Sequence, residues 1–374
     1  MRKLQFALAF LVAVSLNSCD LLNTEDEGDV VIVSENITTP TTWVSSKVYV
    51  IEYGIYIDAN LTIEPGTTIK FKSGTWLSFG GSENMTLTAN GTAENPIIFT
   101  SYSSTPAAGA WQGLWFEDHV LSNSSMSYCE VNYAGESNYH ALNVNRKISI
   151  NNCTITNAKK YGIYCHEGFV SFTGNSISNV GGHAIEIECI GLSSVGENNS
   201  ITCDPGYGIL VRSGNITDNT AETWVKQAVP YYIEGGIYVD KDITIQAGTA
   251  LKFMASAWLE FGGTNSTTLT AVGTEAEPIV FSSAAATPAP GAWAGLFFAE
   301  NTTANTLLKY CTVEYAGKDN DRANITLTHV NGITIENCTI RNSSGYGVFL
   351  YNSSWNNVNN TFSNNTLGDI QVGS

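Results

Sequence analysis

Seven short triplets recur along this chain at a nearly constant spacing. Each triplet begins with Asn or Cys and ends with an apolar residue, and the seven apolar members are Val131, Ile155, Ile177, Ile201, Val313, Ile340 and Phe362. Successive members lie 24, 22 and 24 residues apart from Val131 to Ile201, and 27 and 22 residues apart from Val313 to Phe362. This spacing is typical of a solenoid, in which coils stack and equivalent side chains form ladders. The triplets therefore constrain the fold far more than they constrain the function.

A second ladder consists of an aromatic ring followed by a small residue and an apolar residue. Its rings belong to His140, Tyr161, His183, Tyr207 and Tyr346. Strands of a parallel sheet lie about 4.8 Å apart, so a ring in this position contacts the ring one coil away. We therefore interpret His140 and His183 as packing residues and not as catalytic bases.

A longer repeat divides the chain into two homologous halves, 38–213 and 220–374. The segment 49–71 matches the segment 231–253, and the offset between the halves grows slightly further along the chain, where Cys153 corresponds to Cys338. Short apolar stretches in both halves are separated by Gly, Pro and Asn at coil-length intervals. The hairpins of a β-sandwich would leave the ladders unexplained, so the sequence predicts a parallel β-helix.

Three segments of the first half, 61–67, 91–97 and 109–114, resemble the right-handed parallel β-helix proteins of the pectin-lyase-like superfamily. The resemblance runs from about residue 40 to the end of the chain. It implies an all-β fold, a right-handed parallel β-helix or β-solenoid built from two homologous halves. It also implies polysaccharide lyase or glycoside hydrolase activity, but the motifs Asn-Thr-Asp, Asp-Asp, Gly-His-Gly and Arg-Ile-Lys, expected of the hydrolases, are missing from the sequence.

The first residues have the features of an export signal. Arg2 and Lys3 precede a short apolar stretch at 6–16, which is too short to span a membrane. Residues 1–18 are therefore expected to be a signal peptide. Cys19 lies where the lipobox of bacterial lipoproteins places its lipidated cysteine, and this resemblance implies a lipid anchor. The alternative is an ordinary signal peptide with an incidental cysteine.

An acidic segment follows Cys19. It contains Asp20, Glu25, Asp26, Glu27 and Asp29, and no Lys or Arg occurs between Cys19 and Lys47. We interpret residues 19–37 as a lipidated, solvated tether. The segment also resembles the export signal of surface lipoproteins of the Bacteroidetes, which implies an outer-membrane lipoprotein at the cell surface. A tether that faces the periplasm is the alternative.

The charge balance excludes one class of partner. With 34 acidic and 17 basic residues, the chain has a formal charge of −17. Such a chain repels phosphate backbones, so we expect no nucleic-acid partner. The expected partners are a membrane, through the lipid, and a polysaccharide or a protein of a host or cell surface.

Seven cysteines remain when Cys19 is assigned to the lipid. An odd number cannot pair completely within one chain, and four of the seven occupy the ladder position that Asn fills in other coils. We expect buried free thiols, with a disulfide between Cys189 and Cys203 as the alternative. Because no Cys-x-x-Cys spacing occurs, we expect no zinc site.

The acidic pair Glu186 and Glu188 is the best candidate for chemistry. Both alternate with Ile residues, so both lie on the outer face of one strand, where a coil neighbour brings His166 or Glu167 close. Acid–base catalysis or calcium binding at this pair is the alternative to a solvated surface. Arg212, which a lyase would require, has no recognisable setting in the sequence, and the same is true of Arg146.

His119 belongs to a second acidic cluster, Glu117-Asp118-His119. The equivalent residues of the second half are Ala299, Glu300 and Asn301, so catalysis here would be confined to one half.

Aromatic residues repeat between the halves and offer possible sugar platforms. Trp111 and Trp293 are expected in the core, with a role in glycan stacking as the alternative. The candidate binding residues are Trp115, Phe297, Tyr133 and Tyr315, of which the two tyrosines are expected to expose their rings. Two equivalent platforms would hold one long glycan with avidity.

The leading hypothesis is a surface lipoprotein that binds a glycan or protein without catalysis. A polysaccharide lyase or glycoside hydrolase of the same fold is the first alternative, and a structural spacer is the second. Three or more charged side chains gathered around Glu186 would favour the enzyme.

Overall fold

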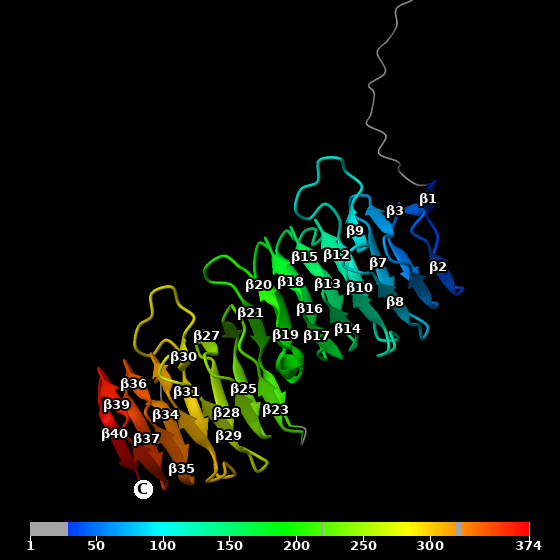
Figure 1. Cartoon of the computed structure of the whole chain (residues 1–374). Coiled ribbons are helices and arrows are strands. Elements are labelled where there is room, and N and C mark those ends of the chain that lie inside the picture. Colours follow the sequence, from blue (N-terminus) through cyan, green and yellow to red (C-terminus); the bar gives the residue numbers. More distant parts are fainter. Residues whose placement is uncertain (1–28, 218–219, 319–322, 374) are drawn as a thin grey trace, which may run out of the picture.

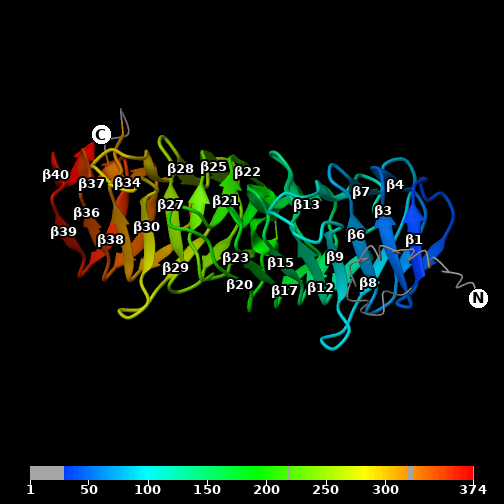
Figure 2. The same cartoon turned by 90° about the horizontal axis from the view of Figure 1, so that it is seen from above.

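The computed structural model describes residues 29–217, 220–318 and 323–373, which form an elongated stack of parallel strands (Figures 1 and 2). Among these residues the one helix is a short 3-10 helix, η1 (Cys189–Ser194), and none has the length and hydropathy of a membrane span. The predicted all-β parallel β-helix is confirmed. The expected signal peptide and Cys19 lie outside the described residues.

Three sheets form the faces of the first half. The eight-stranded sheet contains β1 (Asp29–Val33), β3 (Lys47–Ile51), β6 (Thr68–Phe71), β9 (Ile97–Ser101), β12 (Cys129–Asn132), β15 (Thr154–Thr156), β18 (Ser176–Ser178) and β20 (Ser200–Ile201). A six-stranded sheet contains β2 (Thr41–Trp43), β5 (Leu61–Ile63), β8 (Leu87–Asn90), β11 (Ser125–Ser127), β14 (Ser149–Asn151) and β17 (Ser171–Thr173).

The thirteen-stranded sheet runs through both halves. Its strands from the first half are β4 (Ile55–Ile57), β7 (Trp76–Phe79), β10 (Gly113–Phe116), β13 (His140–Val144), β16 (Tyr161–Cys165), β19 (Ile185–Glu188) and β21 (Ile209–Arg212). It continues with β24 (Tyr231–Ile233), β27 (Ala250–Phe253), β30 (Ile279–Ser283), β33 (Cys311–Glu314), β36 (Thr339–Arg341) and β39 (Thr361–Ser363).

Two further sheets complete the second half. The seven-stranded sheet contains β22 (Gly214–Ile216), β25 (Gly236–Val239), β28 (Trp258–Phe261), β31 (Gly295–Phe298), β34 (Ala323–Thr328), β37 (Tyr346–Tyr351) and β40 (Gly368–Gly373). A second six-stranded sheet contains β23 (Glu222–Trp224), β26 (Ile243–Ile245), β29 (Leu269–Val272), β32 (Leu307–Lys309), β35 (Asn331–Glu336) and β38 (Ser354–Val358).

The second half is turned by one face relative to the first. Tyr231 of β24 corresponds to Tyr49 of β3 in the sequence repeat, yet β3 lies in the eight-stranded sheet and β24 in the thirteen-stranded sheet. In the same way, β7 of the thirteen-stranded sheet corresponds to β28 of the seven-stranded sheet. Equivalent outward side chains of the two halves therefore lie on different faces of the rod.

The interior of the coils is filled by apolar ladders. Trp111 stacks on Phe71 with ring centroids 3.8 Å apart, and Trp293 stacks on Phe253 at 3.9 Å. Both tryptophans are fully buried, and each indole nitrogen donates to a backbone carbonyl at 2.8 Å. The prediction that both are core residues is confirmed, because burial leaves no ring face for a sugar.

The Asn and Cys triplets line the corner before the eight-stranded sheet in the first half and the corner before the thirteen-stranded sheet in the second half. Asn175 Oδ1 accepts a hydrogen bond from the backbone nitrogen of Cys153 at 2.9 Å, and its Nδ2 donates to the carbonyl of Ile150 at 2.9 Å. All seven cysteines of the described residues are free, so the alternative disulfide between Cys189 and Cys203 is wrong. All seven except Cys203 are buried, as expected for small apolar ladder residues.

Candidate functional site

Aromatic rings cover the outer face of the thirteen-stranded sheet in the first half. This aromatic row consists of Tyr56, Trp76, Trp115 and Tyr139, of which Trp76 and Trp115 stack with centroids 4.9 Å apart. Tyr56 contacts Trp76 edge-on at 4.8 Å, and Tyr139 contacts Trp115 at 5.5 Å. The two tyrosines are exposed and the two tryptophans are half-buried, so the row is partly accessible to solvent.

The aromatic row leads directly into a polar region of the same face. In the strand register Trp115 lies beside Asn143, Asn143 beside Tyr164, and Tyr164 beside Glu186. One ladder of outward side chains therefore passes from rings to charges over four neighbouring coils.

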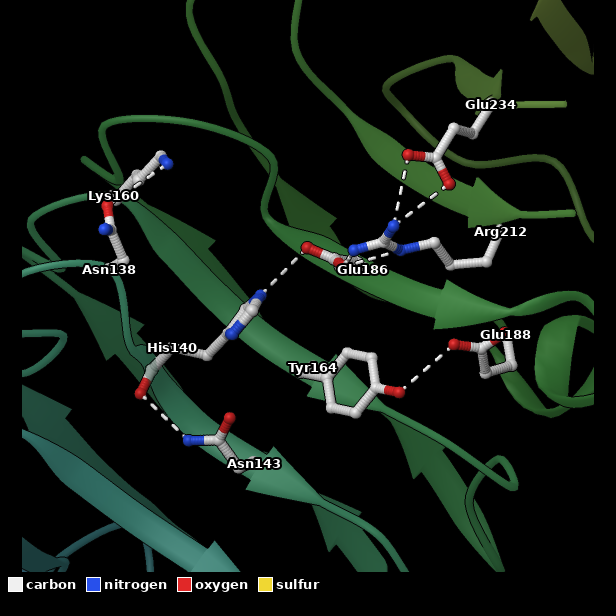
Figure 3. A network of polar contacts seen from close by, with 9 residues as sticks. All are labelled: Asn138, His140, Asn143, Lys160, Tyr164, Glu186, Glu188, Arg212 and Glu234. Carbon is white, nitrogen blue, oxygen red and sulfur yellow. Dashed lines mark hydrogen bonds and ion pairs between the residues drawn. The ribbon is translucent and has the colours of Figure 1, made fainter.

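A charged network follows, formed by His140, Tyr164, Glu186, Glu188, Arg212 and Glu234 (Figure 3). Glu186 lies at its centre: one carboxylate oxygen contacts His140 Nε2 at 3.0 Å, and the other accepts from Arg212 Nε at 2.7 Å. Arg212 Nη1 also donates to both carboxylate oxygens of Glu234 at 3.1 Å.

Two tyrosine rings of β16 also contact the network. The Tyr164 hydroxyl donates to Glu188 at 3.1 Å, and the His140 ring stacks on Tyr161 with centroids 4.8 Å apart. These residues come from β13, β16, β19 and β21, so coil stacking alone brings them together.

The protonation states of the network follow from its hydrogen bonds. Burial opposes the ionisation of Glu186, but hydrogen bonds from His140 and Arg212 outweigh it and lower the pKa of this carboxyl to about 2. Burial, reinforced by the Glu188 carboxylate, raises the pKa of the Tyr164 hydroxyl to about 12. At neutral pH Glu186 is therefore a carboxylate and Tyr164 a neutral phenol, and neither exchanges a proton readily.

The network differs from the solvated surface that the sequence predicts as the default. The Glu186 side chain is only 5% exposed and both of its oxygens are bound, so the expectation of a solvated carboxylate is wrong for this residue. Of its two predicted neighbours, His166 is exposed, and Glu167 instead binds Arg146 at 2.8 Å. Packing alone also does not account for His140, because it contacts Glu186.

Arg212 and His140 are the residues whose roles the sequence analysis missed. Arg212 follows Glu186 by about one coil length, and it faces outward beside Glu188 in the register. Coil spacing combined with strand alternation therefore carries the signal that pairs them.

The four candidate binding residues lie at different places on the rod. Trp115 belongs to the aromatic row, whereas Phe297 is on β31, in the seven-stranded sheet. Tyr133 and Tyr315 are half-buried, so neither shows the exposed ring that we expected, and Tyr315 packs against the core. Trp115 and Phe297 therefore lie on different faces, and a long glycan held by both platforms would have to pass around the rod.

Further polar and hollow regions lie away from this face. A cavity of about 810 Å³ lies on the eight-stranded sheet and is lined by Val30, Val48 and Tyr102, among others. His119 and Asp118 line a cavity of about 310 Å³ with Arg146. Among the described residues, no group of three or more His, Cys, Asp or Glu side chains is arranged to hold a metal ion.

Comparison with known families agrees with the architecture. Residues 35–153 and 214–321 match the model of the pectate-lyase like beta helix domain, and residues 293–374 match that of the right handed beta helix region. No curated protein and no solved structure matches the chain significantly. The matches describe a fold with right-handed coils and name no reaction for this chain.

Proposed function

Because this chain belongs to the family of pectate-lyase-like β-helix domains, we propose that it binds a linear glycan along its aromatic row without cleaving it. One observation carries the proposal: Tyr56, Trp76, Trp115 and Tyr139 form a continuous series of ring contacts on one flat sheet face. Sugars stack on such rings, and the coil repeat of about 4.8 Å is similar to the length of one pyranose residue.

The state of the charged network supports binding over catalysis. A catalytic acid or base needs a proton that it can give or take near neutral pH. Glu186 has a pKa of about 2 and two bound oxygens, and the Arg212 guanidinium is shared by two carboxylates. These groups hold one another, and a substrate would first have to displace those contacts.

An enzyme of the lyase or hydrolase class is the second candidate, because the network meets the condition we set for it. The network holds four charged side chains, Glu186, Glu188, Arg212 and Glu234, and Glu186 orients the His140 imidazole at 3.0 Å. In this alternative, a lyase reaction, His140 takes the proton from the ring carbon that carries a sugar carboxylate, which Arg212 faces. The electron pair of that C–H bond forms a double bond in the ring, and the bond to the oxygen of the leaving sugar breaks.

A panel of plant and host polysaccharides separates these functions. We expect the purified protein to be retained on at least one immobilised glycan, to lose that retention in the Trp115→Ala variant, and to release no new unsaturated or reducing ends. New ends that disappear in a His140→Ala variant would establish the enzyme instead. Absence of both retention and new ends would leave the protein as a spacer.

The place of display is part of the same proposal. We expect lipid on Cys19 to anchor the chain in the outer membrane, with the acidic tether 19–37 holding the β-helix at the cell surface. Cys19→Ala should move the protein from the membrane fraction to the soluble fraction, whereas Cys203→Ala, a half-buried thiol, should not. Protease treatment of intact cells then tests surface exposure, since a periplasmic protein is protected.

A further inference from the structure

Among the residues that the structure describes, the apolar interior of the rod is uncovered at β40, the last strand. The interior ladders Ile325–Val348–Ile370 and Leu327–Leu350–Val372 end on β40. Their earlier members are buried, but Ile370 is 41% exposed and Val372 is 64% exposed. The last strands thus present core side chains and an open strand edge to solvent.

The same coil has a covered counterpart inside the chain. In the repeat that relates Cys153 to Cys338, Ile370 and Val372 of β40 correspond to Ile185 and Ile187 of β19. Both isoleucines are fully buried, because β19 pairs in parallel with β21. In the interior of the rod, this coil is therefore covered by β21.

The covering strand β21 has its own counterpart at the N-terminal end, which is β1. In the first half, Val31 and Val33 of β1 pair with β3. At the equivalent positions of the second half, Ile209 and Val211 of β21 pair with β24. Ile209 and Val211 are fully buried between two coils, whereas Val31 and Val33 are only half-buried and the outward Ile32 is 51% exposed. Within the described residues, the two uncovered ends of the rod thus correspond to the two surfaces that meet at the internal junction.

We propose that copies of this chain associate head to tail, with β40 of one copy pairing in parallel with β1 of the next. The internal register, in which Ile185 faces Ile209 and Ile187 faces Val211, predicts that Ile370 faces Val31 and Val372 faces Val33. The pairing extends the seven-stranded sheet of one copy into the eight-stranded sheet of the next. It covers apolar side chains at both ends and satisfies the backbone groups of both edge strands.

The interface joins two different surfaces, so it does not close into a dimer. Each copy retains one free end of each kind, and repeated addition gives a linear rod. This inference concerns the ends of the coil stack and is independent of the proposed glycan binding on its side.

Sedimentation of the full chain carrying Cys19→Ser, with no C-terminal tag, tests the proposal. We expect a mass that rises with concentration beyond the dimer. Val372→Asp and Val33→Asp should each hold the protein as a monomer, with at least a tenfold higher concentration needed for association, because Val372 and Val33 face each other in the proposed register. Val170→Asp is the matched control, because Val170 is 53% exposed and lies between β16 and β17, away from both ends.

A mixing experiment identifies the interface as head to tail. Each blocked variant retains one intact end, so an equal mixture of Val372→Asp and Val33→Asp should form dimers and no larger species. Dimers of Val33→Asp alone would instead indicate contact between two C-terminal ends and overturn the proposal. A wild-type protein that stays monomeric at high concentration would also overturn it.

Chemical cross-linking checks the register directly. The outward positions Glu186 and Leu210 are partners at the internal junction, and their counterparts are Gln371 and Ile32. In a Cys19→Ser, Cys203→Ser background, Gln371→Cys with Ile32→Cys should give a series of cross-linked multimers with a short bismaleimide. Each single variant should give none, and multimers that are equally frequent with Asn356→Cys in place of Gln371→Cys would contradict the register.

Discussion

The two halves of the molecule share one interior and carry different outer faces. In the interior, Trp111 and Trp293 stack on Phe71 and Phe253 in the same way and bond the same kind of carbonyl. On the outside, the positions of His140, Tyr164 and Glu186 are taken in the second half by Ala323, Phe349 and Gln371. A coil of this fold therefore forms without the charged network, so the network is a property of one face and not of the fold.

The rotation between the halves determines which outer faces lie side by side along the rod. Since β21 pairs with β24, the thirteen-stranded sheet joins two faces that are not equivalent in sequence. Polar clusters of both halves lie on it: Arg212 binds Glu186 in the first half, and Arg341 Nε donates to Glu314 at 2.7 Å in the second. The duplication thus produced one long, chemically mixed face and not two copies of one site.

The largest expected effect tests the likeness of the interiors. Trp111→Ala and Trp293→Ala should each lower the free energy of unfolding by about 3–5 kcal/mol, because each removes a fully buried indole from a stacked pair. Urea unfolding followed by circular dichroism measures both. A difference of more than about 2 kcal/mol between the variants would mean that the two interiors are not energetically equivalent.

The next effect tests the difference of the outer faces. Glu186 has a folded pKa of about 2 against an ordinary value of 4.5, so its ionisation stabilises the fold above pH 4.5 and loses this contribution as the pH falls towards 2. We expect Glu186→Gln to cost about 2 kcal/mol at pH 7, less than the full shift implies because Arg212 is partly exposed. Urea unfolding of wild type and variant across this pH range should show the two stabilities converging in acid.

The matched change in the second half provides the control for this result. Gln371→Glu places a carboxylate at the equivalent position, beside Phe349 and without the Tyr164 and His140 partners of the first half. It should give no stabilisation at pH 7. A stabilising Gln371→Glu, or a Glu186→Gln whose cost is the same at every pH, would show that charge pairing is not the origin of the effect.

A smaller effect separates the two faces in binding. Trp76 and Trp258 are equivalent, and each ring lies over a glycine of the preceding coil, Gly54 or Gly236. Only Trp76 stacks in the aromatic row, where its ring meets Trp115 at 4.9 Å. Trp76→Ala should weaken glycan retention about tenfold, or about 1.4 kcal/mol, and Trp258→Ala less than twofold. Equal losses in affinity electrophoresis would place the glycan on both faces.

The fold was more predictable than the site because the two depend on different information. The ladders at Cys153, Asn175 and Ile177 repeat at coil spacing, and the coil imposes that spacing on every interior and corner position. Strand alternation also placed Glu186 outside correctly. The burial of Glu186 was not predictable in this way, because it depends on which outward side chains one coil away reach it.

The rotation of the halves illustrates the same limit. The long repeat relates Trp115 to Phe297 in sequence, but it does not say by how many faces one half is rotated about the rod axis relative to the other. This rotation is set at the junction, where β21 pairs with β19 of the first half and with β24 of the second. For this reason the sequence equivalence of Trp115 and Phe297 did not predict that the two residues lie on different faces.

The smallest expected effect tests why Cys and Asn exchange in the corner ladder. Cys338 Sγ accepts from the backbone nitrogen of Cys311 at 3.3 Å and donates to the carbonyl of Leu308 at 3.5 Å. Asn360, one coil later, makes the same two contacts with its amide, accepting from Cys338 at 2.8 Å and donating to Ile335. An asparagine at position 338 would therefore find a donor and an acceptor already in place.

Cys338→Asn should change the free energy of unfolding by less than about 1 kcal/mol, since the larger amide replaces weak sulfur contacts with stronger ones. Cys165→Asn is the contrasting variant, because Cys165 is fully buried in β16 in line with Val144 and Ile187 of the interior. An amide there loses its water without gaining the corner partners and should cost about 2 kcal/mol or more. If thermal unfolding shows equal losses for both, the exchange of Cys and Asn reflects size alone, and the corner hydrogen bonds contribute little to the stacking of coils.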